Sequence, residues 1–313
     1  MADPARLLAP FRAALRCPAC GGALADAPDA LACCAAYPVR DDVPVLIDEG
    51  TSVFTIADVL GGASATFVPD RGRLRAALSR VTAPPSRNVA ARANYARFAS
   101  LLCEGSRAPR VLVIGGGSGG DGIEALAGLD VLVTDVCFGP ATALVCDAHR
   151  LPFADGAFDG VVIQAVLEHV LDPAACVAEV HRVLRADGLV YAETPFMQQV
   201  HGGRHDFTRF SLLGHRRLLR RFEELGSGAC CGPGMALAWS VQYFLASFAT
   251  GPTTKRLLRA QGTALTFALP WVDGWLAQRP GALDAASGVW FLGRRSEETL
   301  SDRALLEGYR GAG

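Results

Sequence analysis

An apolar segment that runs directly into a glycine cluster constrains the fold of this chain more than any other feature. Residues 111–114 are four β-formers, residues 115–120 read Gly-Gly-Gly-Ser-Gly-Gly, and a helical segment is expected next. Glycines allow positive φ and let the backbone approach a ligand closely. The N–H groups at the start of a following helix face the same point. The pattern therefore predicts a strand of an α/β sheet that ends in a turn around a nucleotide-like ligand.

Two kinds of ligand fit the glycine spacing. Gly115, Gly117 and Gly120 satisfy the dinucleotide fingerprint G-x-G-x-x-G. Gly115, Gly117 and Gly119 satisfy the G-x-G-x-G turn of S-adenosylmethionine (SAM) methyltransferases. Asp135 ends the next apolar run, 20 residues after Gly115, where either site needs a carboxylate for ribose hydroxyls. A tight turn without a ligand, with Asp135 as a helix cap, is the third alternative.

A longer stretch of the sequence favours SAM. Residues 146–163 closely resemble the D-A-x-x-L-P-F…F-D signature of class I SAM-dependent methyltransferases of the type 11-like group. Residues 164–170 are similar to that family's segment after strand four, and 188–195 to its fifth strand. The resemblance covers about residues 108–230. It implies an α/β fold with a Rossmann-like, mostly parallel sheet of seven strands and helices on both faces.

The chemistry of SAM explains the residues of this stretch. Its ribose diol needs an acceptor carboxylate, and Asp135 is placed to serve. Its adenine needs an acceptor for the exocyclic amine and an apolar slot, and Asp147 and Ala148 follow a third short strand. The resemblance assigns the same roles; an Asx turn at Asp147 is the alternative. The cofactor-binding residues that we expect are Gly115, Gly117, Gly119, Asp135, Asp147, Ala148 and Gln164.

Ionisable residues are concentrated after the predicted fifth strand. In related methyltransferases a loop with this P…H…H-D pattern runs along the mouth of the pocket. Methyl transfer to a hydroxyl requires in-line placement and removal of a proton, for which a histidine is suited. We expect His201 or His205 to be the base, Asp206 to orient it and Arg209 to bind an anionic acceptor. Alternatively, Asp206 and Arg209 pin the loop to the next helix. His169 is predicted to be structural.

Four cysteines near the start of the chain predict a metal site. Cys17 and Cys20 form a Cys-x-x-Cys followed by two glycines, which is half of a zinc knuckle. The other half has the adjacent Cys33 and Cys34 instead, and residues 1–50 resemble a Trm112-like zinc ribbon. Adjacent cysteines usually point apart, so three alternatives stay open. Zinc is held by Cys17, Cys20, one of the pair and another ligand; the metal has been lost and the module packs against the catalytic domain; or both neighbours ligate through an unusual backbone.

The length of 313 residues allows about two domains. An insertion at about 232–287 is rich in aromatic residues. It is predicted to form a helical lid over the acceptor pocket, although plain packing against the sheet is equally allowed. Ser211 is expected to cap a helix through Phe222, with Arg216 and Arg220 on its exposed face. The predicted organisation is a zinc-ribbon-like module at 1–50, a helical linker or cap at 51–108 with helices at 71–81 and 89–103, a methyltransferase domain at 109–297 with an insertion at about 232–287, and a tail at 298–313.

Charge and hydropathy limit the partners. The chain has 30 basic and 31 acidic residues, so it lacks a broad basic surface for nucleic acid, and the basic run 216–221 is interpreted as a solvated helix face. We expect no membrane span. Residues 1–16 do not resemble a secretory signal, which favours a cytoplasmic enzyme whose ten cysteines are reduced thiols or ligands. The expected partners are a small-molecule acceptor and a protein bound through the N-terminal module.

The sequence therefore predicts a SAM-dependent methyltransferase (EC 2.1.1.-) that acts on a small molecule, with oxygen slightly favoured as the methylated atom. The sequence leaves open whether the chain binds a structural zinc ion. One alternative is an NAD(P)-dependent reductase with the same glycine turn, although such a site has no use for an adenine clamp at 147–153. The other is an inactive SAM-fold partner or scaffold protein, in which the loop 201–209 would have no task.

Overall fold

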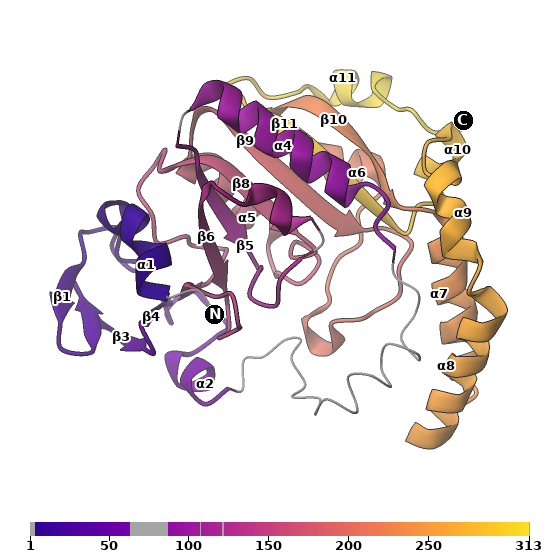
Figure 1. Ribbon diagram of the computed structural model, residues 1–313, viewed down its shortest axis with the longest axis horizontal. Coiled ribbons are helices and arrows are strands. Elements are labelled where there is room, and N and C mark those ends of the chain that lie inside the picture. The colour runs from indigo at the N-terminus through magenta and orange to yellow at the C-terminus, as the bar shows by residue number, and fades with distance from the viewer. Residues whose placement is uncertain (1–3, 63–86, 107, 121, 313) are drawn as a thin grey trace.

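The computed structural model describes residues 4–62, 87–106, 108–120 and 122–312 (Figure 1). Within these ranges, eleven strands are hydrogen-bonded in one continuous order. In spatial order they are β1 (Ala25–Ala27), β2 (Ala30–Ala32), β3 (Ala36–Arg40), β4 (Val43–Leu46), β7 (Leu144–Cys146), β6 (Asp130–Asp135), β5 (Arg110–Ile114), β8 (Phe158–Gln164), β9 (Leu184–Pro195), β11 (Gly288–Arg295) and β10 (Phe222–Cys231).

The sheet is mixed. Strands β4, β7, β6, β5, β8 and β9 run parallel, whereas β11 is antiparallel to both β9 and β10. This confirms the predicted α/β fold with a mostly parallel sheet in its centre. Seven strands, β5 to β11, lie within the region for which seven were predicted, but the sheet does not end there, because β4 of the N-terminal segment pairs with β7 and extends it. All four residues of β4 are buried, as is typical of strands inside parallel sheets.

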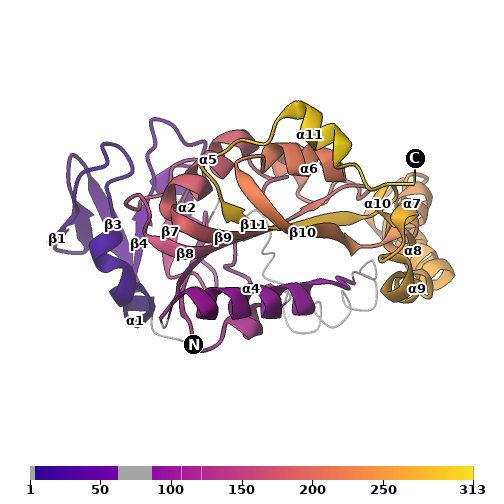
Figure 2. The ribbon, with the colours of Figure 1, turned by 90° about the horizontal axis from the view of Figure 1, so that it is seen from above.

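Helices cover both faces of the sheet (Figure 2). The apolar residues of β5 alternate: Val111 and Val113 pack with helix α4 (Ala91–Gly105), whereas Leu112 and Ile114 pack in the core on the opposite face, with α5 (Pro173–Val183). This alternation follows from the two-residue period of a strand. The other helices are α1 (Pro4–Leu8), η1 (Ala9–Ala14), α2 (Ile56–Leu60), η2 (Ile123–Leu126), η3 (Gly203–His205), α6 (Leu212–Leu218), α7 (Pro233–Ala246), α8 (Pro252–Thr266), α9 (Leu269–Leu276), α10 (Pro280–Leu283) and α11 (Asp302–Glu307).

The N-terminal segment is part of the main core. Phe11 is fully buried and stacks on Phe158 of β8, with ring centroids 5.5 Å apart. Val45 pairs with Val145 in the parallel ladder between β4 and β7. The N-terminal module is therefore packed against β7 and β8, in the same sheet as the strand that ends in the glycine turn.

The helix expected after the glycine turn is reduced to a single 3-10 turn, η2. Gly119, Gly122 and Gly128 all have positive φ around it, at 82°, 92° and 91°. Residues in this conformation cannot continue a right-handed helix. A row of helical N–H groups facing the ligand, as the sequence predicted, is therefore not formed here.

Other local predictions have mixed outcomes. The predicted helix at 89–103 is confirmed as α4, and the one at 71–81 lies outside the described residues. Ser211 caps α6 by accepting a hydrogen bond from the N–H of Gly214 at 3.2 Å, but α6 ends at Leu218. Arg216 was expected on an exposed face. Its side chain is 11% exposed because it lies over Phe291 and pairs with a carboxylate of β10.

The insertion is helical, as predicted, and comprises α7, α8, α9 and α10. Helix α7 borders the central cavity through Met235. Aromatic side chains farther along the insertion, including Phe248, Trp271 and Trp275, are exposed instead. Among the residues that the structure describes, no helix is both long enough and apolar enough to cross a bilayer.

Replacing Phe11 with Ala tests whether the N-terminal segment shares the core. We expect the free energy of unfolding of the whole chain to fall by about 3–5 kcal/mol, because a fully buried aromatic ring is lost. Urea denaturation followed by fluorescence measures this. Leu306→Ala, at a side chain that is 68% exposed, is the control and should change stability by less than about 0.5 kcal/mol. A separate early transition, with the main transition unmoved, would contradict a shared core.

Candidate functional site

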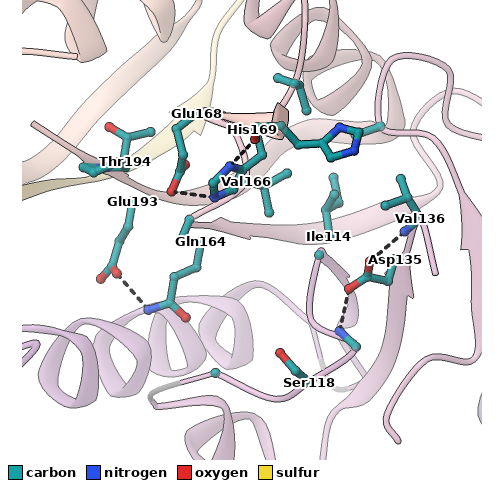
Figure 3. A pocket seen from close by; sticks show the side chains of 18 of the residues that line it. Ile114, Ser118, Asp135, Val136, Gln164, Val166, Glu168, His169, Glu193 and Thr194 are labelled. Carbon is teal, nitrogen blue, oxygen red and sulfur yellow. Dashed lines mark hydrogen bonds and ion pairs between the residues drawn. The ribbon is translucent and has the colours of Figure 1, made fainter. Parts of the chain in front are cut away.

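A cavity of about 500 Å³ lies at the carboxyl ends of the parallel strands (Figure 3). Ligands of open α/β sheets bind at this edge, and the volume suits a nucleoside-sized ligand with space for a small acceptor. Five segments that are distant in sequence line it: 114–120, 134–139, 146–149, 164–171 and 193–195. Val53 and Phe54, which follow the N-terminal module, also line it.

The glycine turn fits tightly around the end of β5. Gly115 has a φ of 72°, and a Cβ at this position would lie 2.3 Å from a methyl group of Val166. The N–H of Gly117 donates to Asp135 Oδ2 at 3.0 Å. A Cβ at Gly117 would lie 2.8 Å from the same oxygen, so a glycine is required for this contact. Gly115, Gly117 and Gly119 all line the cavity, as the sequence predicted.

Asp135 lies at the carboxyl end of β6, opposite the glycine turn. Its Oδ1 accepts a hydrogen bond from the N–H of Val136 at 2.7 Å, and its Oδ2 accepts the one from Gly117. The carboxylate is half-buried and lines the cavity. Each carboxylate oxygen can accept more than one hydrogen bond, so Asp135 retains capacity for hydroxyl donors of a ligand.

Asp147 is held by three donors. Oδ1 accepts from the N–H of His149 at 2.9 Å and faces His149 Nδ1 at 2.6 Å, while Oδ2 accepts from the hydroxyl of Ser52 at 2.5 Å. The bond to the N–H two residues later is the Asx turn that the sequence left open. Burial raises the pKa of Asp147, but the hydrogen bonds from His149 and Ser52 outweigh it, so this pKa lies below its usual value. Ala148 is also buried and lines the cavity.

A buried polar network borders another side of the cavity. Gln164 donates from Nε2 to Glu193 Oε2 at 2.7 Å and accepts at Oε1 from the hydroxyl of Tyr95 at 3.1 Å. Glu193 also accepts from Asn88 at 2.8 Å. Gln164 was predicted from the sequence as a site residue, whereas Glu193 was not. An acidic residue that directly follows the apolar run 189–192 was the available signal.

The loop after β9 is held by the pair of Asp206 and Arg209. Asp206 Oδ2 accepts from the N–H groups of His201 and Gly202, at 2.7 and 3.0 Å. Arg209 donates to both oxygens of Asp206 and to the backbone carbonyls of Gln198, Gln199 and Thr208. The geometry agrees with the alternative in which this pair fixes the loop. Its bonds within the loop account for the donors of Arg209, which is not among the residues that border the cavity.

The two histidines expected as bases lie in different surroundings. His201 borders the cavity, and its Nε2 is 3.7 Å from Glu168 Oε1. His205 also borders it, but stacks on Phe54 with centroids 5.8 Å apart and faces the guanidinium of Arg204 at 3.0 Å. His169, predicted to be structural, lines the cavity as well, while its Nδ1 lies 2.6 Å from the backbone oxygen of His205.

The four N-terminal cysteines converge. Cys17 Sγ lies 3.5 Å from Cys34 Sγ, and Cys20 Sγ lies 3.5 Å from Cys33 Sγ. All four sulfur atoms lie within 4.8 Å of one another. The expectation that adjacent cysteines diverge is therefore wrong for this loop, because Cys33 and Cys34 each face one member of the Cys-x-x-Cys.

Helix α7 supports the loop from the other side. Tyr243 donates from its hydroxyl to the carbonyl of Val200 at 2.8 Å, and Gln199 donates to Ser240 at 3.0 Å. The ring of Trp239 lies edge-on to His201, with centroids 6.3 Å apart. The insertion thus contributes one helix to the end of the cavity that His201 borders.

The comparison with known families concerns the same region. Residues 113–192 match the family described as methyltransferase domain, and they include most of the segments that line the cavity. The chain is 34% identical over 154 residues to a malonyl-[acyl-carrier protein] O-methyltransferase of Laribacter hongkongensis, which covers 41% of this chain and 52% of the relative. It is 40% identical over 110 residues to a demethylmenaquinone methyltransferase of Beutenbergia cavernae, which covers 31% and 46%.

The chain spans about half, or less, of the length of the curated relatives that it matches. Among solved structures, it is similar to the Burkholderia thailandensis 1,6-didemethyltoxoflavin-N1-methyltransferase with bound S-adenosylhomocysteine. The identity is 13%, the TM-score is 0.41, and the superposition covers 84% of this chain and 96% of that chain. The sequence matches identify a methyltransferase-like segment at residues 113–192.

The Asp147 cluster predicts a pH-dependent contribution to stability. Because the pKa of Asp147 is lower in the folded chain than in the unfolded chain, the stability it contributes is present above about pH 4 and is lost as the pH falls through the folded value. We expect Asp147→Asn to lower the free energy of unfolding by about 1.5–3 kcal/mol near neutral pH, and less below about pH 4.

Urea denaturation at several pH values measures the difference from the wild type. Asp41→Asn is the control, because this side chain is 88% exposed. It should give a small, nearly pH-independent change. A difference for Asp147→Asn that grows on acidification would contradict the proposed charge state.

Proposed function

We propose that this chain is a SAM-dependent methyltransferase that acts on a small-molecule acceptor, with oxygen favoured as the methylated atom. The observation that supports it most is the contact between Gly117 and Asp135. This contact places a turn of exposed backbone and a carboxylate side by side at the strand edge of the cavity, within the segment that matches the methyltransferase family.

The cofactor is proposed to lie across the ends of β5, β6 and β7. Asp135 would accept hydrogen bonds from the ribose hydroxyls. Asp147 and Ala148 would border the adenine, with Phe54 as an apolar neighbour from the N-terminal segment. Gln164 would then face the amino-acid tail of the cofactor, since its Oε1 lies beside the glycine turn, 2.8 Å from the point that a Cβ at Gly120 would occupy.

The acceptor is proposed to bind at the other end of the cavity, which His201, Phe207 and Met235 line, whereas His205 lies nearer the adenine through its contact with Phe54. The sulfonium methyl group is already electrophilic, so the chain has to align the nucleophile and allow its proton to leave. Of the two candidate histidines, His201 is favoured for this role, because Glu168 lies beside its Nε2 and Asp206 fixes its backbone.

Two alternatives predict different ligands. A nicotinamide-dependent reductase would bind NADH at the same turn, and an inactive scaffold protein would bind SAM, or neither ligand, without turnover. The match of residues 113–192 to a methyltransferase family favours the first proposal over the reductase. Relatives that carry the names of malonyl-[acyl-carrier protein] and demethylmenaquinone methyltransferases suggest small-molecule or carrier-bound acceptors as first candidates.

Calorimetry with SAM and NADH tests the cofactor. We expect SAM to bind and NADH to give no heat of binding. Asp135→Ala should weaken SAM binding by about 10–100-fold, because hydrogen bonds to a charged group are lost. Asp135→Asn, which keeps the shape, should show a smaller loss. Asp130→Ala, at the exposed opposite end of β6, is the control and should leave the affinity unchanged. NADH binding in place of SAM would refute the proposal.

We also propose that the cysteine cluster binds one structural zinc ion. Four Zn–S bonds of about 2.3 Å in a tetrahedron place sulfur atoms about 3.8 Å apart, close to the observed spacing. Tyr37 lies 3.3 Å from Cys17 Sγ, where its hydroxyl can donate to a ligating thiolate. A zinc at this position would tie the two loops of the N-terminal module together. This module is also the proposed surface for a protein partner.

Metal analysis of the purified chain tests the zinc proposal. We expect the double variant Cys20→Ser with Cys33→Ser to contain about one equivalent of zinc less than the wild type and to unfold at a lower temperature. Cys103→Ser, an exposed cysteine outside the cluster, is the control. Equal zinc contents in the wild type and the double variant would refute this site.

A further inference from the structure

Glu168 is a buried carboxylate without hydrogen bonds at the acceptor end of the cavity. Its side chain is 0% exposed, and neither of its oxygens has a hydrogen-bond partner among the described residues. The other three buried carboxylates of the described chain, Asp147, Glu193 and Asp273, each accept at least two hydrogen bonds. A buried carboxylate that lacks donors is costly unless a positive charge accompanies it, so Glu168 is suited to hold a cation.

Two imidazoles face the same carboxylate. His169 Nε2 lies 3.5 Å from Glu168 Oε1, and His201 Nε2 lies 3.7 Å from that oxygen. Their rings are edge-on, with centroids 4.9 Å apart. The ligand atoms of the three residues all lie within 4.8 Å of one another. Figure 3 shows Glu168 and His169 next to each other, away from Asp135 and Ser118 at the glycine turn.

In each of the two histidines, the hydrogen bonds of Nδ1 determine whether the Nε2 that faces Glu168 carries a proton or a lone pair. His169 Nδ1 donates to the carbonyl of His205, at 2.6 Å, which leaves Nε2 without a proton in the neutral ring. His201 Nδ1 faces two acceptors, Gln199 O at 3.3 Å and Asp206 Oδ2 at 3.5 Å, against one donor, Arg209 at 3.4 Å. With Nδ1 protonated in both rings, two nitrogen lone pairs and a carboxylate oxygen converge on one point.

We infer that Glu168, His169 and His201 bind a divalent transition-metal cation. Bonds of about 2.1 Å place adjacent ligand atoms about 3.0–3.4 Å apart, and the separations of the two histidine nitrogens from Glu168 Oε1, 3.5 and 3.7 Å, exceed this by only a few tenths of an ångström. Two imidazoles and one carboxylate with open positions form the facial arrangement typical of such ions, whereas calcium and magnesium prefer oxygen ligands alone. The backbone carbonyl on His169 Nδ1 is the support that metal-bound histidines usually have.

The loop after β9 acquires a role in this site. Asp206 accepts a hydrogen bond from the N–H of His201. Arg209 donates to Asp206 and to the backbone carbonyls of Gln198 and Gln199. The N–H of Phe207 donates to the carbonyl of Glu168 at 2.8 Å and ties the loop to the segment after β8. Asp206 and Arg209 are thus positioning residues that bring a ligand from the loop to two ligands from the segment after β8.

The role of this cation site in binding the acceptor rests on the proposed function. Glu168, His169 and His201 all line the cavity, so a cation held by them would be open to acceptors with two neighbouring oxygen atoms, one of them the hydroxyl that is methylated. A bound cation would lower the pKa of that hydroxyl, and the proton would leave to solvent water. The oxygen then attacks the methyl carbon, and the S–CH₃ electron pair returns to sulfur to give S-adenosylhomocysteine. His201 acts as a ligand in this case and not as the base.

Titration of chelator-treated protein with Co²⁺ tests the site without an acceptor. Thiolate-bound cobalt shows an intense near-ultraviolet charge-transfer band, which an N,N,O site lacks, so the two proposed sites are distinguishable in one chain. We expect the wild type to bind one equivalent of Co²⁺ that adds nothing to this band. Glu168→Gln and, separately, His169→Gln should lose that equivalent or bind it at least tenfold more weakly. His205→Gln, which borders the same cavity outside the cluster, is the matched control and should retain it.

The affinity for SAM is measured on the same samples. Loss of the cobalt equivalent with unchanged SAM affinity would support the cation site and show that the variants are folded. An equivalent that persists in both Glu168→Gln and His169→Gln, or a wild type whose bound cobalt all produces the thiolate band, would overturn it. Failure of SAM to bind the wild type would refute the proposed function instead, since the cobalt count does not depend on SAM.

Discussion

The parallel pairing of β4 with β7 is the contact on which the cavity depends. Val45 and Leu46 pair with Val145 and Cys146, and all four side chains are buried. Asp147 follows directly after β7 and is held by Ser52, which follows β4. One wall of the cavity is therefore built by two segments that a shared ladder keeps in register, and displacement of the N-terminal module would remove donors from that wall.

The central strands and the turn at their edge were predictable because their signals are local. Continuous apolar runs such as 111–114 and the run that Asp135 ends identify strands, and adjacent glycines identify the turn. The pairing of β4 with β7 was not predictable, since no local pattern specifies a partner so distant in sequence. The short η2 followed from positive φ at Gly122 and Gly128, which composition suggests only weakly.

The residues that form the site were predicted better than the role of each residue. Asp135 and Gly117 meet as expected because both follow adjacent parallel strands. Arg209 was expected to bind an anion, yet its donors are used within its own loop, an outcome that depends on the loop conformation. Glu168 was missed as a functional residue because it lies inside the segment 164–170, which was interpreted only as a family resemblance. Its acidic side chain, directly after the apolar pair Val166 and Leu167, was the overlooked signal.

The separation of β4 and β7 along the chain has a consequence for biosynthesis. When β4 leaves the ribosome, the strand that completes its ladder, β7, is still about a hundred residues from being made. Until then the fully apolar β4 has an open edge that can pair with other chains. Nascent chains are thus expected to depend on chaperones during this interval, and slow translation between the two strands would lengthen it.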